Sequence, residues 1–206
     1  MTHIFRVHPD NPQARLLKQA ADIIHGGGVV IYPTDSCYAL ACHLGDKKAL
    51  DRIIRIRQLN DKHLFTLLCK DLAEISDYAK VDNTVYRMLK VLTPGCFTFV
   101  LKAKSNVPRR IMHSSRKTIG LRVPDHNIAQ ELLSHVGEPL LTTSLVKPGN
   151  DLPEHDPEDI FDDFAKLVDL VIDGGYGGYD ETTVVDCTDG EPHVIRQGKG
   201  DFDQYA

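Results

Sequence analysis

Residues 29–40 read Val-Val-Ile-Tyr-Pro-Thr-Asp-Ser-Cys-Tyr-Ala-Leu, and this stretch decides the expected fold. Its first four residues form a continuous apolar run, which is typical of a strand buried on both faces. Pro33 ends the run because proline cannot donate to a sheet ladder. Polar residues follow at the carboxyl end of the strand, where loops of open α/β sheets commonly line a ligand crevice. The same residue types also form ordinary turns, so a simple turn is the alternative.

Alternating helix and strand patterns surround this stretch. Asn11 and Pro12 indicate the N-cap and first position of a helix that runs to Ile24. Asp46 indicates the N-cap of a second helix, with Leu50 on its apolar face. Beyond it we expect helices at 82–92, 128–136 and 157–167, and strands at 64–69, 97–101, 118–123, 140–144 and 168–172. Two closing strands, 182–186 and 193–196, are too close together for a crossover helix and are expected to pair antiparallel.

This order predicts one α/β domain over residues 1–206, built on a twisted open mixed sheet of parallel and antiparallel strands with flanking helices. The length of 206 residues suits one large domain or two small ones at roughly 150 residues per domain. The acidic loop 147–156 is expected to be a lid or a surface connection. The glycine-rich segment 174–178 could cradle an anion, but a flexible hairpin before a closing strand is the preferred interpretation.

Composition excludes several classes of protein. A hydrophobic fraction of 42% and a charged fraction of 26% exclude disordered, collagen-like and disulfide-scaffold chains. No apolar run approaches the roughly 18 to 20 residues of a membrane-spanning helix. Residues 1–10 lack the apolar segment of a signal peptide. Five cysteines without a CxxC spacing suit free buried thiols, so a cytoplasmic location without membrane contact is expected.

Charge is distributed unevenly along the chain. Residues 47–122 contain 17 lysines and arginines against 6 acidic residues, whereas residues 150–191 contain 14 acidic residues and one base, Lys166. A basic segment of this kind can attract an anionic partner while the whole chain, at a net charge of -5, remains acidic. The alternative is that folding brings the two segments together and neutralises them as surface ion pairs.

The common nucleotide and hydrolase motifs are absent. No GxxxxGK[ST] or GxSxG sequence occurs, and the glycines at 26–28 precede their strand instead of following it. The ten histidines form neither HExxH nor a Cys/His zinc pattern, so no structural metal is predicted. Arg55 and Arg57 end the second helix and share a site only if the helix stops there, because alternate helical residues diverge by about 200°. Arginine forks bind phosphate or carboxylate bidentately, although a solvated helix end is the alternative.

Several motifs in order give the sequence a family resemblance over nearly its whole length. They are PTDS-Y-L (33–40), RIR (55–57), TPGCFTFVLKA (93–103), TIGLRVP (118–124), TTSL (142–145), TTVVD (182–186) and VIRQG (194–198). In this order they resemble the YrdC/YciO family, and its YciO branch most of all. The resemblance implies a YrdC/RibB-like sheet with a concave, positively charged surface proposed to bind double-stranded RNA or tRNA.

The best-understood members of that family are threonylcarbamoyladenylate synthases, which combine threonine, bicarbonate and ATP and release pyrophosphate in tRNA modification. The resemblance implies catalytic roles for Arg55, Arg57 and Ser144, which match the KxR and SxN motifs. It implies that substrate or nucleotide is bound by Thr34, Ser36, Lys62, Arg122 and Arg196, of which the last two match the RxP and RxG motifs. ATP or AMP and threonine are the implied ligands, with Mg²⁺ accompanying ATP. Positioning and charge stabilisation suffice for this chemistry.

Three positions depart from the family pattern, all at the end of the implied site that would bind the nucleotide. Arg55 replaces a lysine, which exchanges a point charge for a planar fork. Val146 replaces the asparagine of SxN, so Val146→Asn, alone or paired with Arg55→Lys, is expected to raise pyrophosphate release or nucleotide affinity unless the side chain faces the core. Glu181 stands where the family has PST, and its negative charge opposes the binding of a polyphosphate.

The sequence thus predicts a nucleotidyltransferase of the synthase type. The alternative is a non-catalytic module that binds double-stranded RNA or tRNA. The sequence leaves the oligomeric state undetermined.

Overall fold

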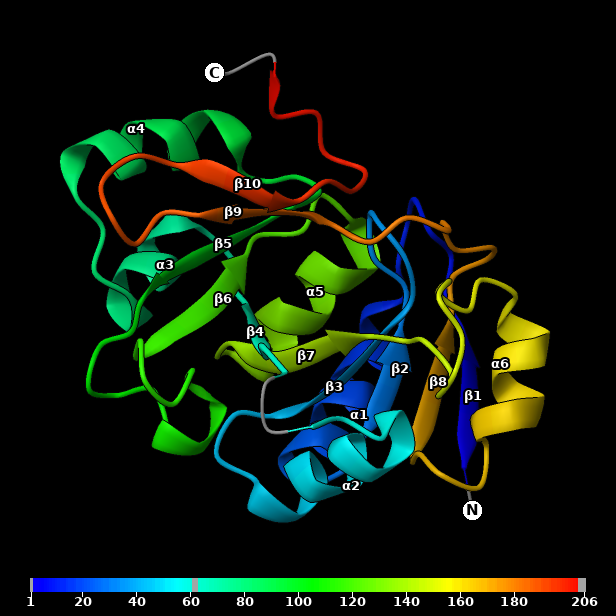
Figure 1. Ribbon diagram of the computed structural model, residues 1–206. Coiled ribbons are helices and arrows are strands. Elements are labelled where there is room, and N and C mark those ends of the chain that lie inside the picture. Colours follow the sequence, from blue (N-terminus) through cyan, green and yellow to red (C-terminus); the bar gives the residue numbers. More distant parts are fainter. Residues whose placement is uncertain (1, 61–62, 204–206) are drawn as a thin grey trace.

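The apolar run at residues 29–32 forms an interior strand of a mixed sheet (Figure 1). The computed structural model describes residues 2–60 and 63–203, and within them the sheet has ten strands. The strands are β1 (His3–Arg6), β2 (Val30–Tyr32), β3 (Ala39–His43), β4 (Thr66–Leu68), β5 (Phe97–Lys102), β6 (Thr118–Arg122), β7 (Leu140–Ser144), β8 (Leu170–Asp173), β9 (Thr183–Asp186) and β10 (His193–Arg196). Their order across the sheet is β1-β8-β2-β3-β7-β4-β6-β5-β9-β10.

The sheet mixes both strand directions, as the sequence predicts. The pairs β1–β8, β2–β8, β4–β6 and β5–β9 are parallel. The pairs β2–β3, β3–β7, β4–β7, β5–β6 and β9–β10 are antiparallel. The prediction of antiparallel closing strands is therefore confirmed.

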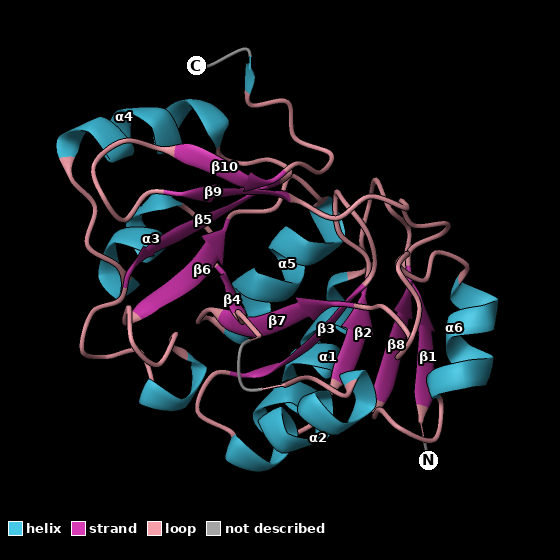
Figure 2. Ribbon diagram, in the orientation of Figure 1, coloured by secondary structure: helices cyan, strands magenta, loops and turns pink. Residues whose placement is uncertain are grey.

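Helices cover the sheet on both faces (Figure 2). They are α1 (Ala14–His25), α2 (Lys47–Arg57), α3 (Leu72–Tyr78), α4 (Asn83–Leu92), α5 (Asn127–Val136) and α6 (Pro157–Phe164), with a short 3-10 turn at Arg109–Ile111. Four of them begin at an aspartate whose carboxylate accepts a backbone N–H of the first turn, at positions 46, 71, 82 and 156. Within the described residues, no helix is long and apolar enough to span a membrane.

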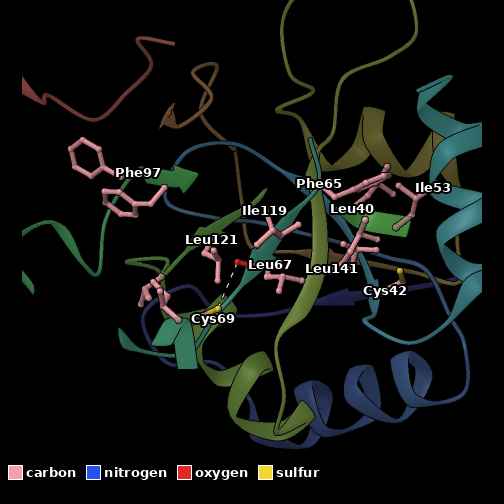
Figure 3. Close-up of a cluster of buried hydrophobic side chains, with 14 of the residues drawn as sticks. Leu40, Cys42, Ile53, Phe65, Leu67, Cys69, Phe97, Ile119, Leu121 and Leu141 are labelled. Carbon is pink, nitrogen blue, oxygen red and sulfur yellow. Dashed lines mark hydrogen bonds between the residues drawn. The ribbon is translucent and has the colours of Figure 1, made fainter. Parts of the chain in front are cut away.

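Two apolar cores fill the space between sheet and helices. One face of β8, β2 and β3 packs against α1 and α5. The opposite face packs against α2, α3, α4 and α6 in a larger core, part of which Figure 3 shows around Leu67, Leu121 and Leu141. Alternate residues of β4, β6 and β7 supply this core, so their neighbours along each strand face the other way.

Several predicted elements differ from those observed. Helix α1 begins after Gln13, because the His8 side chain accepts the N–H groups of Asp10 and Asn11 and holds that segment in a turn. Segment 174–178 is not a hairpin: the chain leaves β8 and enters β9 seven strands away. The segment instead crosses the loop at 33–38, where a Cβ on Gly178 would lie 2.1 Å from the Ser36 carbonyl oxygen.

Candidate functional site

A cavity of about 340 Å³ opens on the sheet where α1 and α5 no longer cover it. Strand alternation explains its polar walls. Leu67, Leu121 and Leu141 face the larger core, and the residues beside them, including Thr66, Gly120 and Thr142, line the cavity. The described residues that line it are Cys37, Ala39, His63, Leu64, Thr66, Thr98, Val100, Gly120, Arg122, Thr142, Thr143, Ser144, Glu181, Thr182, Val184, Ile195 and Arg196.

Arg122 lies in the cavity wall at the end of β6 and is held by the loop after β2. Its guanidinium pairs with Asp35, and both side chains are less than a tenth exposed. Nη1 also donates to Ser36 Oγ at 3.2 Å. Arg122 Nε is buried without a hydrogen-bond partner among the described residues. A buried charge with an unsatisfied donor is costly unless a ligand or water completes it, so this atom is a candidate ligand contact.

Thr34 and Ser36 shape the loop and do not line the cavity. Thr34 Oγ1 donates to the Cys37 carbonyl at 2.7 Å and accepts the Ser36 N–H at 3.1 Å. Both side chains are buried. The structure therefore places them one layer behind the cavity, where they orient the loop that carries Asp35 toward Arg122.

Arg57 is the last residue of α2 and lies beside the cavity. One of its amino groups donates to the Val146 carbonyl, two residues beyond Ser144. Partial burial lowers the pKa of Arg57, opposed by the attraction of Glu181. Its Nε is buried with no hydrogen-bond partner among the described residues. Each arginine thus has one unsatisfied N–H; Arg122 lies in the cavity lining, and the charge of Arg57 acts on His63 of the same lining.

Glu181 and Arg196 form an ion pair on the far wall of the cavity. Arg196 Nη1 lies 2.9 Å from Glu181 Oε2, and Nη2 donates to the Thr182 carbonyl at 3.0 Å. Thr182 Oγ1 in turn hydrogen-bonds Thr98 Oγ1 at 2.7 Å. The arginine implied for nucleotide contact is therefore occupied by a carboxylate of this chain.

Hydroxyl groups and an uncharged imidazole complete the lining. His63 Nε2 lies 3.1 Å from Thr143 Oγ1, and burial together with the charge of Arg57 lowers the His63 pKa to about 4. Burial raises the pKa of Cys37, and a hydrogen bond with Ser144 opposes that shift. Near neutral pH, His63 and Cys37 are consequently neutral, and Arg57, Arg122 and Arg196 supply the positive charge.

The remaining predicted site residues lie elsewhere. Arg55 points away from Arg57, because α2 continues through both, and it lines a separate open groove with Lys147 and Lys166. Val146 is 7% exposed and lies outside the described cavity lining, and its carbonyl oxygen accepts a hydrogen bond from Arg57. Lys62 falls outside the described residues.

Comparison with known proteins shows the family to which the chain belongs. Residues 22–198 match the Sua5/YciO/YrdC family model, whose description is telomere recombination. The chain belongs to this family. It is 55% identical to the uncharacterized protein YciO of Escherichia coli over the full length of both chains, and the crystal structure of E. coli YciO superimposes with a TM-score of 0.96.

Two more distant relatives carry a more specific name or a ligand. Threonylcarbamoyl-AMP synthase of Nitrosococcus oceani is 29% identical over 77% of this chain and 85% of its own. The crystal structure of P. abyssi Sua5 complexed with L-threonine superimposes with a TM-score of 0.90 at 27% identity. That comparison covers 98% of this chain and 59% of the Sua5 chain.

Sequence reasoning missed several features of the site. Asp35 belongs to the quoted PTDS motif, but only the fold reveals that it neutralises Arg122 from 87 residues away. His63 immediately precedes the predicted strand at 64–69 and belongs to none of the quoted motifs. Thr66 is the first residue of β4, Thr98 is the second of β5, and Thr142 and Thr143 are the third and fourth of β7; hydroxyl residues within otherwise apolar strands were the available signal.

Proposed function

We propose that this protein binds an α-amino acid of the threonine type together with ATP in the cavity, as a nucleotidyltransferase of the threonylcarbamoyl-AMP synthase type. The observation that carries the proposal is a pair of buried guanidinium N–H groups with no partner among the described residues, one on Arg122 in the lining of a hydroxyl-rich cavity and one on Arg57, whose charge acts on His63 of that lining. Such donors suit a carboxylate or a phosphate. The threonine complex of P. abyssi Sua5 supports the amino acid as one ligand.

The proposed reaction has two steps. The threonine amine attacks the carbon of bicarbonate and water leaves, which gives a carbamate. A carbamate oxygen then attacks the α-phosphorus of ATP, and the bond to pyrophosphate breaks. The protein has to hold the reactants in line and balance the charge of the leaving group, for which guanidinium and hydroxyl groups suffice.

Mg²⁺ fits this site only as part of the nucleotide complex. Among the described residues, the cavity lining contains one carboxylate, Glu181, and that group is already paired with Arg196. Magnesium prefers oxygen ligands and is commonly held by substrate phosphates with few protein carboxylates. When bound, it would supply neutralisation of the polyphosphate charge.

Calorimetric titration of L-threonine, with and without ATP, tests the proposal. We expect saturable binding to the wild-type protein and a loss of affinity of roughly 10- to 100-fold in Arg57→Ala, because hydrogen bonds to charged groups contribute about 1.5 to 3 kcal/mol. Arg87→Ala is the matched control, since Arg87 is an exposed arginine on α4. Equal binding by both variants, or no threonine binding at millimolar concentration, would contradict the proposal.

A further inference from the structure

Three side chains outside the cavity converge at the opposite end of β3 and β7. His25 ends α1, His43 ends β3, and Glu138 lies in the connection between α5 and β7. Within the described residues, their candidate ligand atoms all lie within 4.8 Å of one another. The sequence shows no metal motif here because 18 and then 95 residues separate them, so only the fold brings them together.

Rigid elements fix this convergence. In the β3–β7 ladder His43 is opposite Leu140, two residues beyond Glu138, whereas Ala39 is opposite Ser144 in the cavity. Four residues of strand separate the two ends, a length of roughly 13 Å. Helices α1 and α5 pack in the same core, which places the end of α1 beside the start of β7. The cluster is thus distinct from the cavity.

The contacts within the cluster already favour a cation. His43 Nε2 lies 2.6 Å from Glu138 Oε1, and the His25 and His43 rings are 5.8 Å apart at an interplanar angle of 58°. About a third of each side chain of the His43–Glu138 pair is exposed, so an ion can reach it from solvent. Two imidazoles and one carboxylate are a donor set that suits zinc, with a fourth position for water. We propose that His25, His43 and Glu138 bind a divalent transition-metal ion of the zinc class.

Metal binding requires two small adjustments. Tetrahedral ligands of zinc lie about 3.4 Å apart, so the more distant atoms must move inward, while His43 Nε2 and Glu138 Oε1, now 2.6 Å apart, must separate. The Gly45 N–H donates to His43 Nδ1 at 3.1 Å, and the proton of a neutral ring is then on Nε2. Coordination through Nε2 needs that proton on Nδ1, so the ring must turn away from Gly45. Gly45 is exposed, and water can accept its N–H instead.

Competition with a chromophoric zinc chelator tests the proposal on tag-free protein. One zinc ion is expected per chain, and both His43→Asn and Glu138→Gln should lower zinc affinity at least tenfold. His193→Asn is the control, because His193 is an exposed histidine on β10. Melting curves of the variants establish that each is folded, and partly exposed Glu138 provides the variant least disruptive to the core.

Two results would overturn the site. One is the absence of stoichiometric zinc binding to the wild-type chain. The other is zinc binding that His43→Asn and Glu138→Gln leave unchanged, since the ion would then be held elsewhere, for example near His63. X-ray absorption of the zinc-loaded protein should show two imidazole ligands in the wild type and one in His43→Asn. The same titration with Mg²⁺ should show no binding, because nitrogen donors favour transition metals.

Discussion

At the scale of single residues, the cavity lining combines charged arginines with a histidine that is uncharged near neutral pH. The pKa of His63 is lowered to about 4 by burial first and by the Arg57 charge second, with Arg196 adding to the shift. The neutral ring can hydrogen-bond a ligand without adding to the positive charge. It also links the stability of the fold to pH.

The His63 shift predicts a pH dependence with a definite sign. Between pH 6.5 and about 4 the unfolded chain binds the His63 proton and the folded chain does not, so the free energy of unfolding falls as pH falls through this range. The contribution is roughly 1 to 3 kcal/mol, reduced by partial exposure. Urea unfolding of wild type and His63→Asn should show a shallower pH slope in the variant.

Nuclear magnetic resonance of the His63 ring provides the direct check. Its Cε1 proton should keep the chemical shift of a neutral ring down to about pH 5. A titration midpoint near 6.5 would show that the ring is not desolvated as described.

The Glu181–Arg196 ion pair is the second consequence at this scale. Because Glu181 occupies Arg196 and opposes a polyphosphate, Glu181→Ser should raise ATP affinity by about tenfold or more, in line with one charge-assisted hydrogen bond. Calorimetric titration of Mg-ATP measures it. The double variant Glu181→Ser/Arg196→Gln is the control and should lose the gain; a single variant with unchanged or weaker ATP affinity would count against this role.

At the scale of elements, two loops hold each other in place. Segment 174–178 crosses the loop at 33–38, and the Tyr38 hydroxyl donates to the Gly175 carbonyl at 2.6 Å. A Cβ on Gly178 would lie 2.1 Å from the Ser36 carbonyl oxygen, which no side-chain movement can relieve. The loop that supports Arg122 therefore depends on this glycine.

Gly178→Ala should lower the free energy of unfolding by about 1 to 3 kcal/mol and weaken threonine binding. Gly45→Ala is the matched control, because its Cβ would meet only the His43 ring at 3.5 Å, an ordinary contact. Urea denaturation and calorimetry measure the two effects. Equal stability of the two variants would show that the contact between the loops is unimportant.

The sequence predicted elements where periodicity was strong and missed them where it was weak. Strands β2 and β5 are apolar runs bounded by turn residues, and they were predicted within a residue or two. Strand β3 lacks β-branched residues, β1 is a short partly polar edge strand, and α3 has seven residues, so none of the three carries a clear pattern. Thr34 and Ser36 lie in the loop beside the cavity but outside its described lining, because residue type does not encode which way a side chain points within a loop.

At the scale of the whole molecule, the uneven charge is partly neutralised. Two arginines of the basic segment, Arg52 and Arg116, pair with Asp169 and Asp186 of the acidic segment. The basic segment still has exposed lysines and arginines on several elements, at positions 47, 48, 70, 80, 87, 90, 102, 104, 109 and 117. The RNA-binding function therefore stays a prediction.

Binding of tRNA or double-stranded RNA by this surface should depend steeply on salt. Each neutralised phosphate adds about 0.7 to 0.9 to the slope of log affinity against log salt concentration. Fluorescence anisotropy at 50 to 200 mM salt measures the slope. Lys102→Glu/Lys104→Glu should reduce it, and an affinity that does not change with salt would argue against an RNA-binding surface.

The central claim concerns the cavity, and pyrophosphate release tests it most directly. The protein is mixed with ATP, bicarbonate, L-threonine and Mg²⁺, and pyrophosphate is measured by an enzyme-coupled assay. We expect pyrophosphate release that requires threonine, bicarbonate and ATP together. The release should be lost in Arg57→Ala and should persist in Arg87→Ala. Pyrophosphate release at the same rate without threonine, or none from wild type and Glu181→Ser alike, would contradict the synthase-type function.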